Sequence, residues 1–216
     1  MIVAFAVIVL FATAAFGSDP DTINDYCVAD LKSSVMFNGY PCKSADMVVT
    51  SDFLFTGFRG LGADTNNSLG IGLTPAFASV NYPGLNAQGL GLVRFDYARG
   101  GLVPPHTHPR ASEVLYVTHG IVFVGFVDSG GKFWSATLTA GDVFLFPRGL
   151  VHFQLNVGNG KAMSISTVNG QNPGVQLIAS ALFGSTPAIR DDVLAKGFGI
   201  NKTDVQMIKK SFERAM

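Results

Sequence analysis

The chain carries little charge and has no extended basic cluster. Its 216 residues include 15 lysines and arginines and 15 aspartates and glutamates, so the formal net charge is zero. Apart from Lys209 and Lys210, no run of positive residues could follow a phosphate backbone, so nucleic-acid binding has no electrostatic basis. A phosphate-binding loop is also missing, because no Lys-Ser or Lys-Thr follows the glycines of residues 57–72.

The apolar stretch at the start of the chain is too short for a membrane span. A transmembrane helix needs roughly 20 apolar residues, whereas the run in residues 1–17 stops at Ser18 and Asp19. Small residues close to its end predict a secretory signal peptide cleaved between Gly17 and Ser18, although the basic residues that usually precede such a run are absent. Residues 18–216 would then form a secreted, extracellular protein with no membrane span.

Cysteine is scarce, and this limits what the thiols can do. Cys27 and Cys42 are the only two cysteines, and in an oxidising compartment they most simply form one disulfide. Closing a loop of about 15 residues would contribute roughly 3 kcal/mol in the chain-entropy model. The wide spacing does not suit a redox or metal-binding pair, so we expect a structural bridge.

Two tripeptides match the acceptor motif for N-linked glycosylation, which secretion makes usable. They begin at Asn66 and Asn201. Asn66 lies in a stretch rich in glycine and asparagine that predicts an exposed loop, so it is the favoured site.

Histidine and glutamate are also rare, yet they gather in two stretches. The chain has four histidines and two glutamates. His106 and His108 are two residues apart, so that in an extended strand both imidazoles face the same way, and Glu113 follows them. His152 lies in a second stretch with similar glycine and proline punctuation, whereas His119 is expected to be an ordinary polar residue at a turn. Three imidazoles and one carboxylate form an N3O set that suits a divalent transition metal and leaves coordination positions open.

The spacing of these residues carries a family resemblance. It resembles the two motifs of the cupin superfamily, and further stretches resemble the germin-like proteins of plants. The stretches are Gly100-x5-His106-x-His108-x4-Glu113-x6-Gly120, Gly141-x5-Pro147-x-Gly149-x2-His152-x3-Asn156, SDPDTINDYCVADL, the cysteine pair, PRGLVHFQLNVGN and NGQNPGVQLIASALFGSTP. The resemblance implies manganese as the metal, held by His106, His108, Glu113 and His152, with Asn156 or Gln154 supporting the ligands.

The remaining pattern predicts one all-β domain followed by helices. Short segments rich in Val, Phe and Leu alternate with glycine turns, which favours a barrel or sandwich, and a cupin jelly-roll β-barrel is the natural choice. The expected barrel covers about residues 50–183. The expected strands are 90–98, 113–117, 121–128, 133–139, 142–146, 151–157 and 163–169.

Helical spacing replaces the strand pattern near the end of the chain. Residues 187–195 and 203–215 are expected to be helices, within a C-terminal region of about residues 187–216. The germin-like resemblance implies that these helices clasp a neighbouring subunit in a homo-oligomer, a hexamer built as a trimer of dimers. The alternative is that they fold back on their own barrel.

The resemblance implies two oxidoreductase activities, and two residues discriminate between them. Oxalate-oxidising germins resemble this chain but carry two asparagines that line the site, and a gapless count places Val93 and Val103 at those positions. Valine cannot donate a hydrogen bond to a bound dicarboxylate, so a site built on such bonds loses several kcal/mol of binding. Superoxide needs only an accessible redox metal, so superoxide dismutase is the leading function and oxalate oxidase the alternative. Other residues that could supply a donor are Arg94, Arg99 and Asn86.

Two further functions stay open. Nucleotide-sugar phosphodiesterase activity belongs to the wider family, although the chain has no dedicated phosphate site. A non-enzymatic extracellular or cell-wall binding protein, with a structural metal, is the alternative from another functional class.

Overall fold

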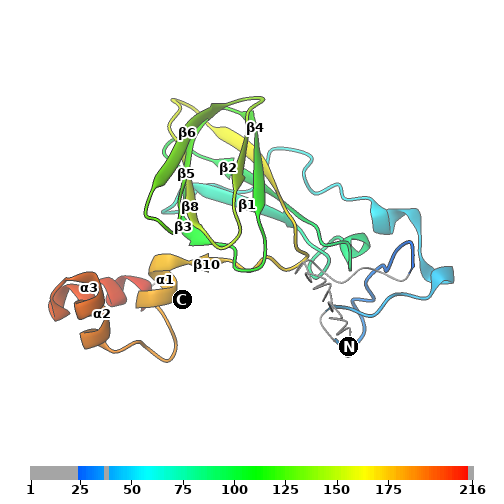
Figure 1. The fold of residues 1–216 in the computed structure, drawn as a ribbon. Helices are drawn as coiled ribbons and strands as arrows, with labels where there is room; N and C mark the ends of the chain where they lie inside the picture. The colour runs from blue at the N-terminus through cyan, green and yellow to red at the C-terminus, as the bar shows by residue number, and fades with distance from the viewer. Residues whose placement is uncertain (1–23, 37–38, 214–216) are drawn as a thin grey trace, which may run out of the picture.

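The computed structural model describes residues 24–36 and 39–213. The predicted signal peptide, residues 1–17, lies outside the described residues. Two antiparallel sheets form a barrel in the centre of Figure 1, with an extended N-terminal arm on one side and a group of helices on the other. This architecture confirms the all-β jelly-roll prediction with C-terminal helices.

Each sheet of the barrel contains five strands. Their orders are β1-β2-β9-β4-β7 and β10-β3-β8-β5-β6, and neighbouring strands are antiparallel throughout. The strands are β1 (Ile71–Ala76), β2 (Gly91–Tyr97), β3 (Leu102–Thr107), β4 (Glu113–His119), β5 (Ile121–Val127), β6 (Phe133–Thr139), β7 (Val143–Phe146), β8 (Val151–Asn156), β9 (Ala162–Val168) and β10 (Gln176–Leu177).

Strand β4 shows why the barrel closes around an apolar core. Its side chains alternate, so that Glu113, Leu115 and Val117 are buried while Val114 and Tyr116 are exposed, as the two faces of a pleated strand require. Inward side chains of the other strands complete the core. Its buried members are Phe95, Tyr97, Val103, Leu115, Val117, Val122, Val124, Leu138, Phe146 and Ala162.

The structure adds two strands, β1 and β10, that the sequence pattern did not predict. Strand β1 contains Gly72 and Pro75 at the edge of its sheet, and both residue types weaken the strand signal. Strand β10 is only two residues long. Strand β3 contains Pro104 and Pro105, and its register with β8 shifts between Val103 and His106. Since proline cannot donate to a sheet ladder, this irregularity falls where the prolines are.

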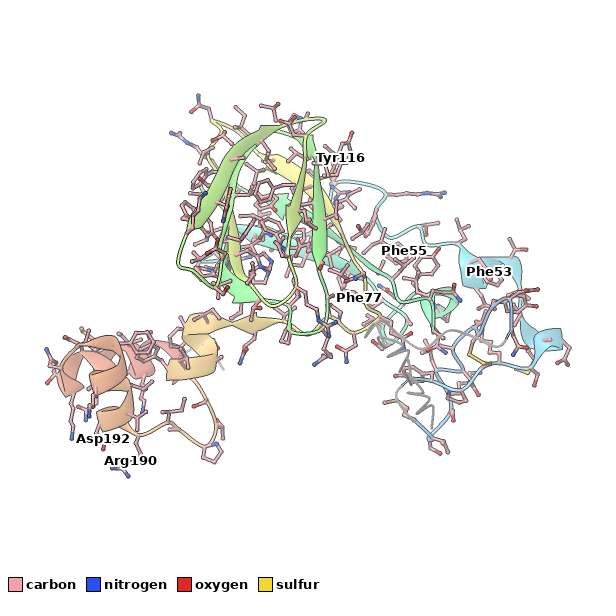
Figure 2. All side chains as sticks on the ribbon, viewed as in Figure 1. Phe53, Phe55, Phe77, Tyr116, Arg190 and Asp192 are labelled. Atoms are coloured by element: carbon pink, nitrogen blue, oxygen red, sulfur yellow. A yellow bond between two sulfur atoms is a disulfide. The ribbon has the colours of Figure 1, made fainter. Side chains whose placement is uncertain are left out.

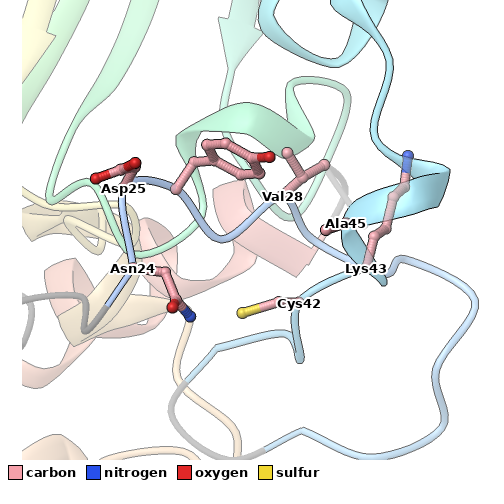
Figure 3. A pocket seen from close by; sticks show the side chains of 7 residues that line it. Asn24, Asp25, Val28, Cys42, Lys43 and Ala45 are labelled. Atoms are coloured by element: carbon pink, nitrogen blue, oxygen red, sulfur yellow. The ribbon is translucent and has the colours of Figure 1, made fainter.

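The N-terminal arm is tied together by the disulfide between Cys27 and Cys42. It contains the short 3-10 helices η1 (Ala45–Met47) and η2 (Thr50–Phe53), and η3 (Pro83–Leu85) lies between β1 and β2. Phe53 and Phe55 lie on the arm (Figure 2), where Phe55 stacks on Tyr82 with ring centroids 5.6 Å apart. A pocket in this arm is lined by Asn24, Asp25, Tyr26, Val28, Cys42, Lys43 and Ala45 (Figure 3), and none of these is a predicted ligand.

The helices form a group with its own small core. They are α1 (Ile178–Phe183), α2 (Asp191–Phe198) and α3 (Lys202–Glu213), and their buried centre is Phe183, Leu194 and Val205. Helix α1 contacts β3 and β10, whereas α2 and α3 lie beside it and away from the barrel (Figure 1). Within the described part of the chain, no helix is long and apolar enough to cross a membrane.

The helix prediction was right in kind and wrong in detail. Helix α2 begins at Asp191, not at residue 187, because Arg190 has an extended backbone with ψ 139° and serves as the N-cap. Helix α1 was assigned to the end of the barrel. Helix α3 begins one residue before the predicted start, and the last predicted helical residues, 214–215, lie outside the described chain.

Both predicted glycosylation sites have exposed asparagines. Asn66 lies in the exposed loop before β1. Asn201 precedes α3, and its side-chain oxygen accepts a hydrogen bond from the backbone N–H of Asp204 at 2.8 Å, which caps the helix.

Candidate metal centre

The barrel brings the four predicted ligands together at one end of its interior. His106 and His108 come from the end of β3 and the residue after it, while Glu113 and His152 come from the first residues of β4 and β8. One ligand atom from each of the four residues lies within 4.8 Å of the others. The side chains are buried, with exposed fractions of 2%, 7%, 1% and 1% for His106, His108, Glu113 and His152.

Backbone carbonyls hold all three imidazoles in the same tautomer. The Nδ1 atom of His106 lies 2.9 Å from the carbonyl of Pro104, and that of His152 lies 2.9 Å from the carbonyl of Leu150. The Nδ1 atom of His108 lies 2.6 Å from the carbonyl of Gly174. Since a carbonyl can only accept, each Nδ1 donates its proton and leaves Nε2 as the ligand atom.

Glu113 completes the cluster through both of its oxygens. Its Oε2 lies 2.9 Å from Nε2 of His108 and 3.3 Å from Nε2 of His152. Its Oε1 accepts hydrogen bonds from the Ser166 hydroxyl at 2.6 Å and from the Gln154 amide at 3.3 Å. These two donors fix the carboxylate while Oε2 faces the imidazoles.

This geometry fits a metal cation. A neutral imidazole whose Nδ1 carries the proton presents Nε2 as an acceptor, and here two such acceptors face a carboxylate oxygen. Two acceptor atoms repel each other at this distance, so a positive charge must lie between the imidazole nitrogens and the carboxylate oxygen. A proton or a metal ion can supply that charge. Three nitrogens and one oxygen suit manganese, iron or zinc, so the donor set leaves the choice among them open.

The electrostatics keep His106 and Glu113 in the forms that bind a metal. Burial, reinforced by neighbouring His152, lowers the pKa of His106 to about 4, so this imidazole is neutral at pH 7. Burial opposes ionisation of Glu113, but its close contacts with His108 and His152 and the hydrogen bond from Ser166 outweigh burial and hold the pKa of Glu113 well below its ordinary value. For His108, burial is the largest single effect and lowers the pKa, but the contact with the Glu113 carboxylate, its negative charge and the carbonyl of Gly174 together raise the pKa above its ordinary value.

The two residues suggested as supports lie in different places. Gln154 contacts Glu113, as described above, whereas the Asn156 amide donates to the carbonyls of Ala98 and Gly160 at 2.7 and 2.8 Å. Asn156 therefore closes a turn and does not contact the cluster. Ser166 was not singled out from the sequence, because β9 has two serines at inward positions, Ser164 and Ser166, and only the pairing of β9 with β4 shows which of them lies beside Glu113.

The two valines that discriminate between activities lie on the inner face of the barrel. Val93 pairs across the sheet with Ser166, and Val103 pairs with Gln154. Directly opposed residues in a sheet share a face, so both valines point the same way as the two side chains that bond Glu113. The wall beside the cluster is therefore apolar at these two positions.

The alternative donors do not reach the cluster. Arg94 is buried against Asp96 at 2.7 Å and donates to the carbonyl of Phe58. Asn86 bonds the backbone of Tyr40 on the N-terminal arm. Arg99 is exposed in the turn between β2 and β3, at the other end of the barrel from the cluster. His119 is exposed at the end of β4 beside the Gly120 turn.

A barrel of two antiparallel sheets with three histidines and one glutamate at one end of its interior defines a cupin. The family model for cupins matches residues 61–206. Germin-like protein 1-1 of Oryza sativa subsp. japonica is 46% identical over 97% of this chain and 95% of its own length. Germin-like protein subfamily 2 member 1 of Arabidopsis thaliana is 46% identical over 95% of each chain.

Solved structures agree with this assignment. An oxalate oxidase in complex with the substrate analogue glycolate is 37% identical, covers 90% of this chain and 98% of its own, and superposes with a TM-score of 0.86. Peruvianin-I, a cysteine peptidase from Thevetia peruviana latex, is 36% identical over 74% of this chain, with a TM-score of 0.71. The chain belongs to the germin-like proteins of the cupin family.

Proposed function

We propose that this protein is a secreted manganese-binding oxidoreductase that dismutates superoxide. The observation that carries the proposal is the buried cluster of three histidines and one glutamate, flanked by two valines where a dicarboxylate would need hydrogen-bond donors. Manganese is the metal that membership in the germin-like proteins favours. When bound, it would supply one-electron cycling between Mn(II) and Mn(III), by which one superoxide is oxidised to dioxygen and another, taking up two protons from solvent, is reduced to hydrogen peroxide.

The residues of the chain have separable roles in this proposal. The three imidazoles and Glu113 would hold the ion, and the Nδ1 bonds to backbone carbonyls orient the rings toward it. Gln154 and Ser166 fix the carboxylate of Glu113. The apolar wall that includes Val103, 8% exposed, keeps water away from one side of the cluster.

Secretion, glycosylation and assembly belong to the same proposal. We infer a mature protein of residues 18–216 that is exported to the apoplast or cell wall, carries glycans at Asn66 and Asn201, and assembles into a homo-hexamer through its terminal helices. The position of α2 and α3 away from the barrel supports an inter-subunit role for the helices (Figure 1). Analytical ultracentrifugation and mass spectrometry of the secreted protein test both points.

The test of the leading function is the rate of superoxide removal by purified protein, normalised to bound manganese. We expect the rate to scale with manganese content and to vanish in chelator-treated protein. Full manganese occupancy without superoxide removal would reject superoxide dismutase as the function. It would leave the ligand set standing and favour either oxalate oxidation or a non-enzymatic binding role.

Oxalate oxidation is the second candidate, and the likeness to a glycolate-bound oxalate oxidase favours it. The test is hydrogen peroxide release from oxalate by the native protein and by the double variant Val93→Asn, Val103→Asn. We expect no release from the native protein and a measurable gain in oxalate binding by the variant, because two amide donors then face the site. Release by the native protein would establish oxalate oxidase despite the valines.

A further inference from the structure

Five loops lie at the end of the barrel where the candidate metal centre is, and their net charge is positive. They cover residues 77–90 between β1 and β2, 108–112 between β3 and β4, 128–132 between β5 and β6, 147–150 between β7 and β8, and 169–175 between β9 and β10. Their sequence contains Arg110, Arg148 and Lys132 against a single acidic residue, Asp128. Lys132 and Asp128 both contact Trp134 on the β5–β6 hairpin, so the two arginines carry the net charge. Both arginines are exposed.

The Arg110 guanidinium is fixed beside Gly174, the residue whose carbonyl is bonded to His108. Its Nε donates to the carbonyl of Asn172 at 2.8 Å, and its Nη2 donates to the Asn172 side chain at 2.8 Å. The guanidinium lies against Gly174, where an added Cβ would be 3.0 Å from Nη2. The carbonyl of this same glycine accepts the Nδ1 proton of His108. The charge of Arg110 is therefore fixed beside the outer edge of the His108 ring.

Arg148 is fixed to the same turn from the adjacent loop. Its Nε donates to the carbonyl of Pro109 at 3.1 Å, and the backbone N–H of the following residue, Gly149, donates to the carbonyl of His108 at 3.1 Å. Arg110 is thus anchored to the 169–175 loop, and Arg148 is anchored to the 108–112 loop.

We propose that Arg110 and Arg148 form a cationic rim that draws small anions to the metal centre. A divalent cation held by three neutral imidazoles and one carboxylate keeps a net positive charge, and the rim extends this field to the surface. Positive groups that line the entrance to a site raise the local concentration of an anionic ligand and speed its capture. The inference deepens the proposed function, because superoxide and oxalate are both small anions.

The test measures anion capture without turnover. Azide binding to the manganese-loaded protein is titrated at about 0.01 M ionic strength, where the Debye length is about 30 Å, and at about 1 M, where it is about 3 Å. We expect Arg110→Gln with Arg148→Gln to weaken azide binding by roughly three- to tenfold at low ionic strength. At high ionic strength the native protein and the variant should bind azide equally.

Two matched variants separate charge from geometry. Arg110→Lys with Arg148→Lys keeps the charge but loses the fork that bonds Asn172, so it should retain most of the native affinity at low salt. Arg99→Gln removes an exposed arginine from the opposite end of the barrel and should leave azide binding unchanged. The proposal would be wrong if the lysine variant or Arg99→Gln lost as much azide affinity at low ionic strength as the double glutamine variant. It would also be wrong if the double glutamine variant bound azide with native affinity.

The azide-binding test does not depend on whether the protein has superoxide dismutase activity. Manganese content is measured for each variant, and if the change at Arg110 lowers it, Arg148→Gln alone carries the test with an expected loss of about twofold at low ionic strength. If the protein captures azide through the rim but does not remove superoxide, the proposal for the rim stands and the proposal of superoxide dismutase activity is rejected. Where turnover is found, its salt dependence identifies the natural anion, because a dianion such as oxalate responds more steeply than superoxide.

Discussion

The two ends of the barrel interior are made from the same strands but have opposite chemistry. At one end, Glu113 on β4 meets the three histidines, while two and four residues further along the same face, Leu115 and Val117 are fully buried among apolar side chains. Strand β9 changes in the same way, because Ser166 bonds Glu113 and Ser164 bonds Tyr97 in the core. The apolar end supplies stability, and the polar end places charges in a region of low dielectric where their interactions are strong.

The comparison teaches that metal binding and folding stability can be changed separately by residues on one strand. Substitutions at the polar end should alter metal affinity first, and those at the apolar end should alter the free energy of unfolding first. The following variants test this separation in order of decreasing effect.

His108→Ala should have the largest effect and abolish manganese binding. It removes one of the four clustered side chains and leaves Oε2 of Glu113 without its closest partner, 2.9 Å away. Metal content after dialysis, measured by atomic emission, should fall to background, and superoxide removal should disappear with it. His119→Ala is the matched control, since that histidine is exposed, and it should keep native metal content. A His108→Ala protein with full manganese would refute the ligand assignment.

Leu115→Ala should destabilise the protein without removing the metal. The side chain is fully buried, and replacing buried leucine by alanine costs about 2–5 kcal/mol, depending on how far the cavity collapses. Urea unfolding of the metal-free protein measures the change, and manganese content of the folded protein should stay native. Loss of metal at full folding would show that the two ends are coupled.

The sequence could predict the cluster of three histidines and one glutamate and most of the strands, because both depend on side-chain patterns. Histidine spacing indicated the cluster, and alternation indicated strands such as β4. Strand β1 escaped detection because glycine and proline interrupt its pattern. The hydrogen bond between His108 and Gly174 could not be predicted either, because Gly174 contributes only its backbone carbonyl, which every residue type has.

Other features depend on three-dimensional neighbours that spacing does not encode. Ser166 became recognisable as a partner of Glu113 only once the pairing of β4 with β9 was known. Asn156, two residues after Gln154 on β8, has the same inward alternation, yet it bonds a turn because it lies further from the ligand end. The alternation of residues along a strand predicts which face a side chain occupies, but how far along the barrel that side chain lies depends on the register of the sheet.

Ser166→Ala should reduce manganese affinity by about 10- to 100-fold, as is typical when a group supporting a ligand is lost. The serine hydroxyl donates to Oε1 of Glu113 at 2.6 Å, and without this bond the carboxylate is less firmly oriented. Competition with a chelator of known affinity measures the change. Native affinity in this variant would show that Gln154 alone suffices to orient Glu113.

Ser164→Ala should have the smallest effect and serves as the counterpart of Ser166→Ala, two residues away on the same face. It leaves the hydroxyl of Tyr97, 3.0 Å from the serine oxygen, without this partner, at a cost of about 1–3 kcal/mol for a buried unsatisfied group. Chemical denaturation should show this loss, and Tyr97→Phe added to Ser164→Ala should recover most of it. Manganese affinity should remain native in both variants, and a large drop would contradict the division between the two ends.

The hydrogen bond between His108 and Gly174 also sets when the site can mature. The two residues are 66 positions apart, and a chain that is synthesised from its N-terminus at about 5–20 residues per second presents His108 several seconds before Gly174. The last ligand, His152, and the hydroxyl of Ser166 also precede this carbonyl. A metal held by these four residues would therefore be selected late in biosynthesis, where the nearly complete chain folds, and the ion supply of that compartment would decide which cation the protein acquires.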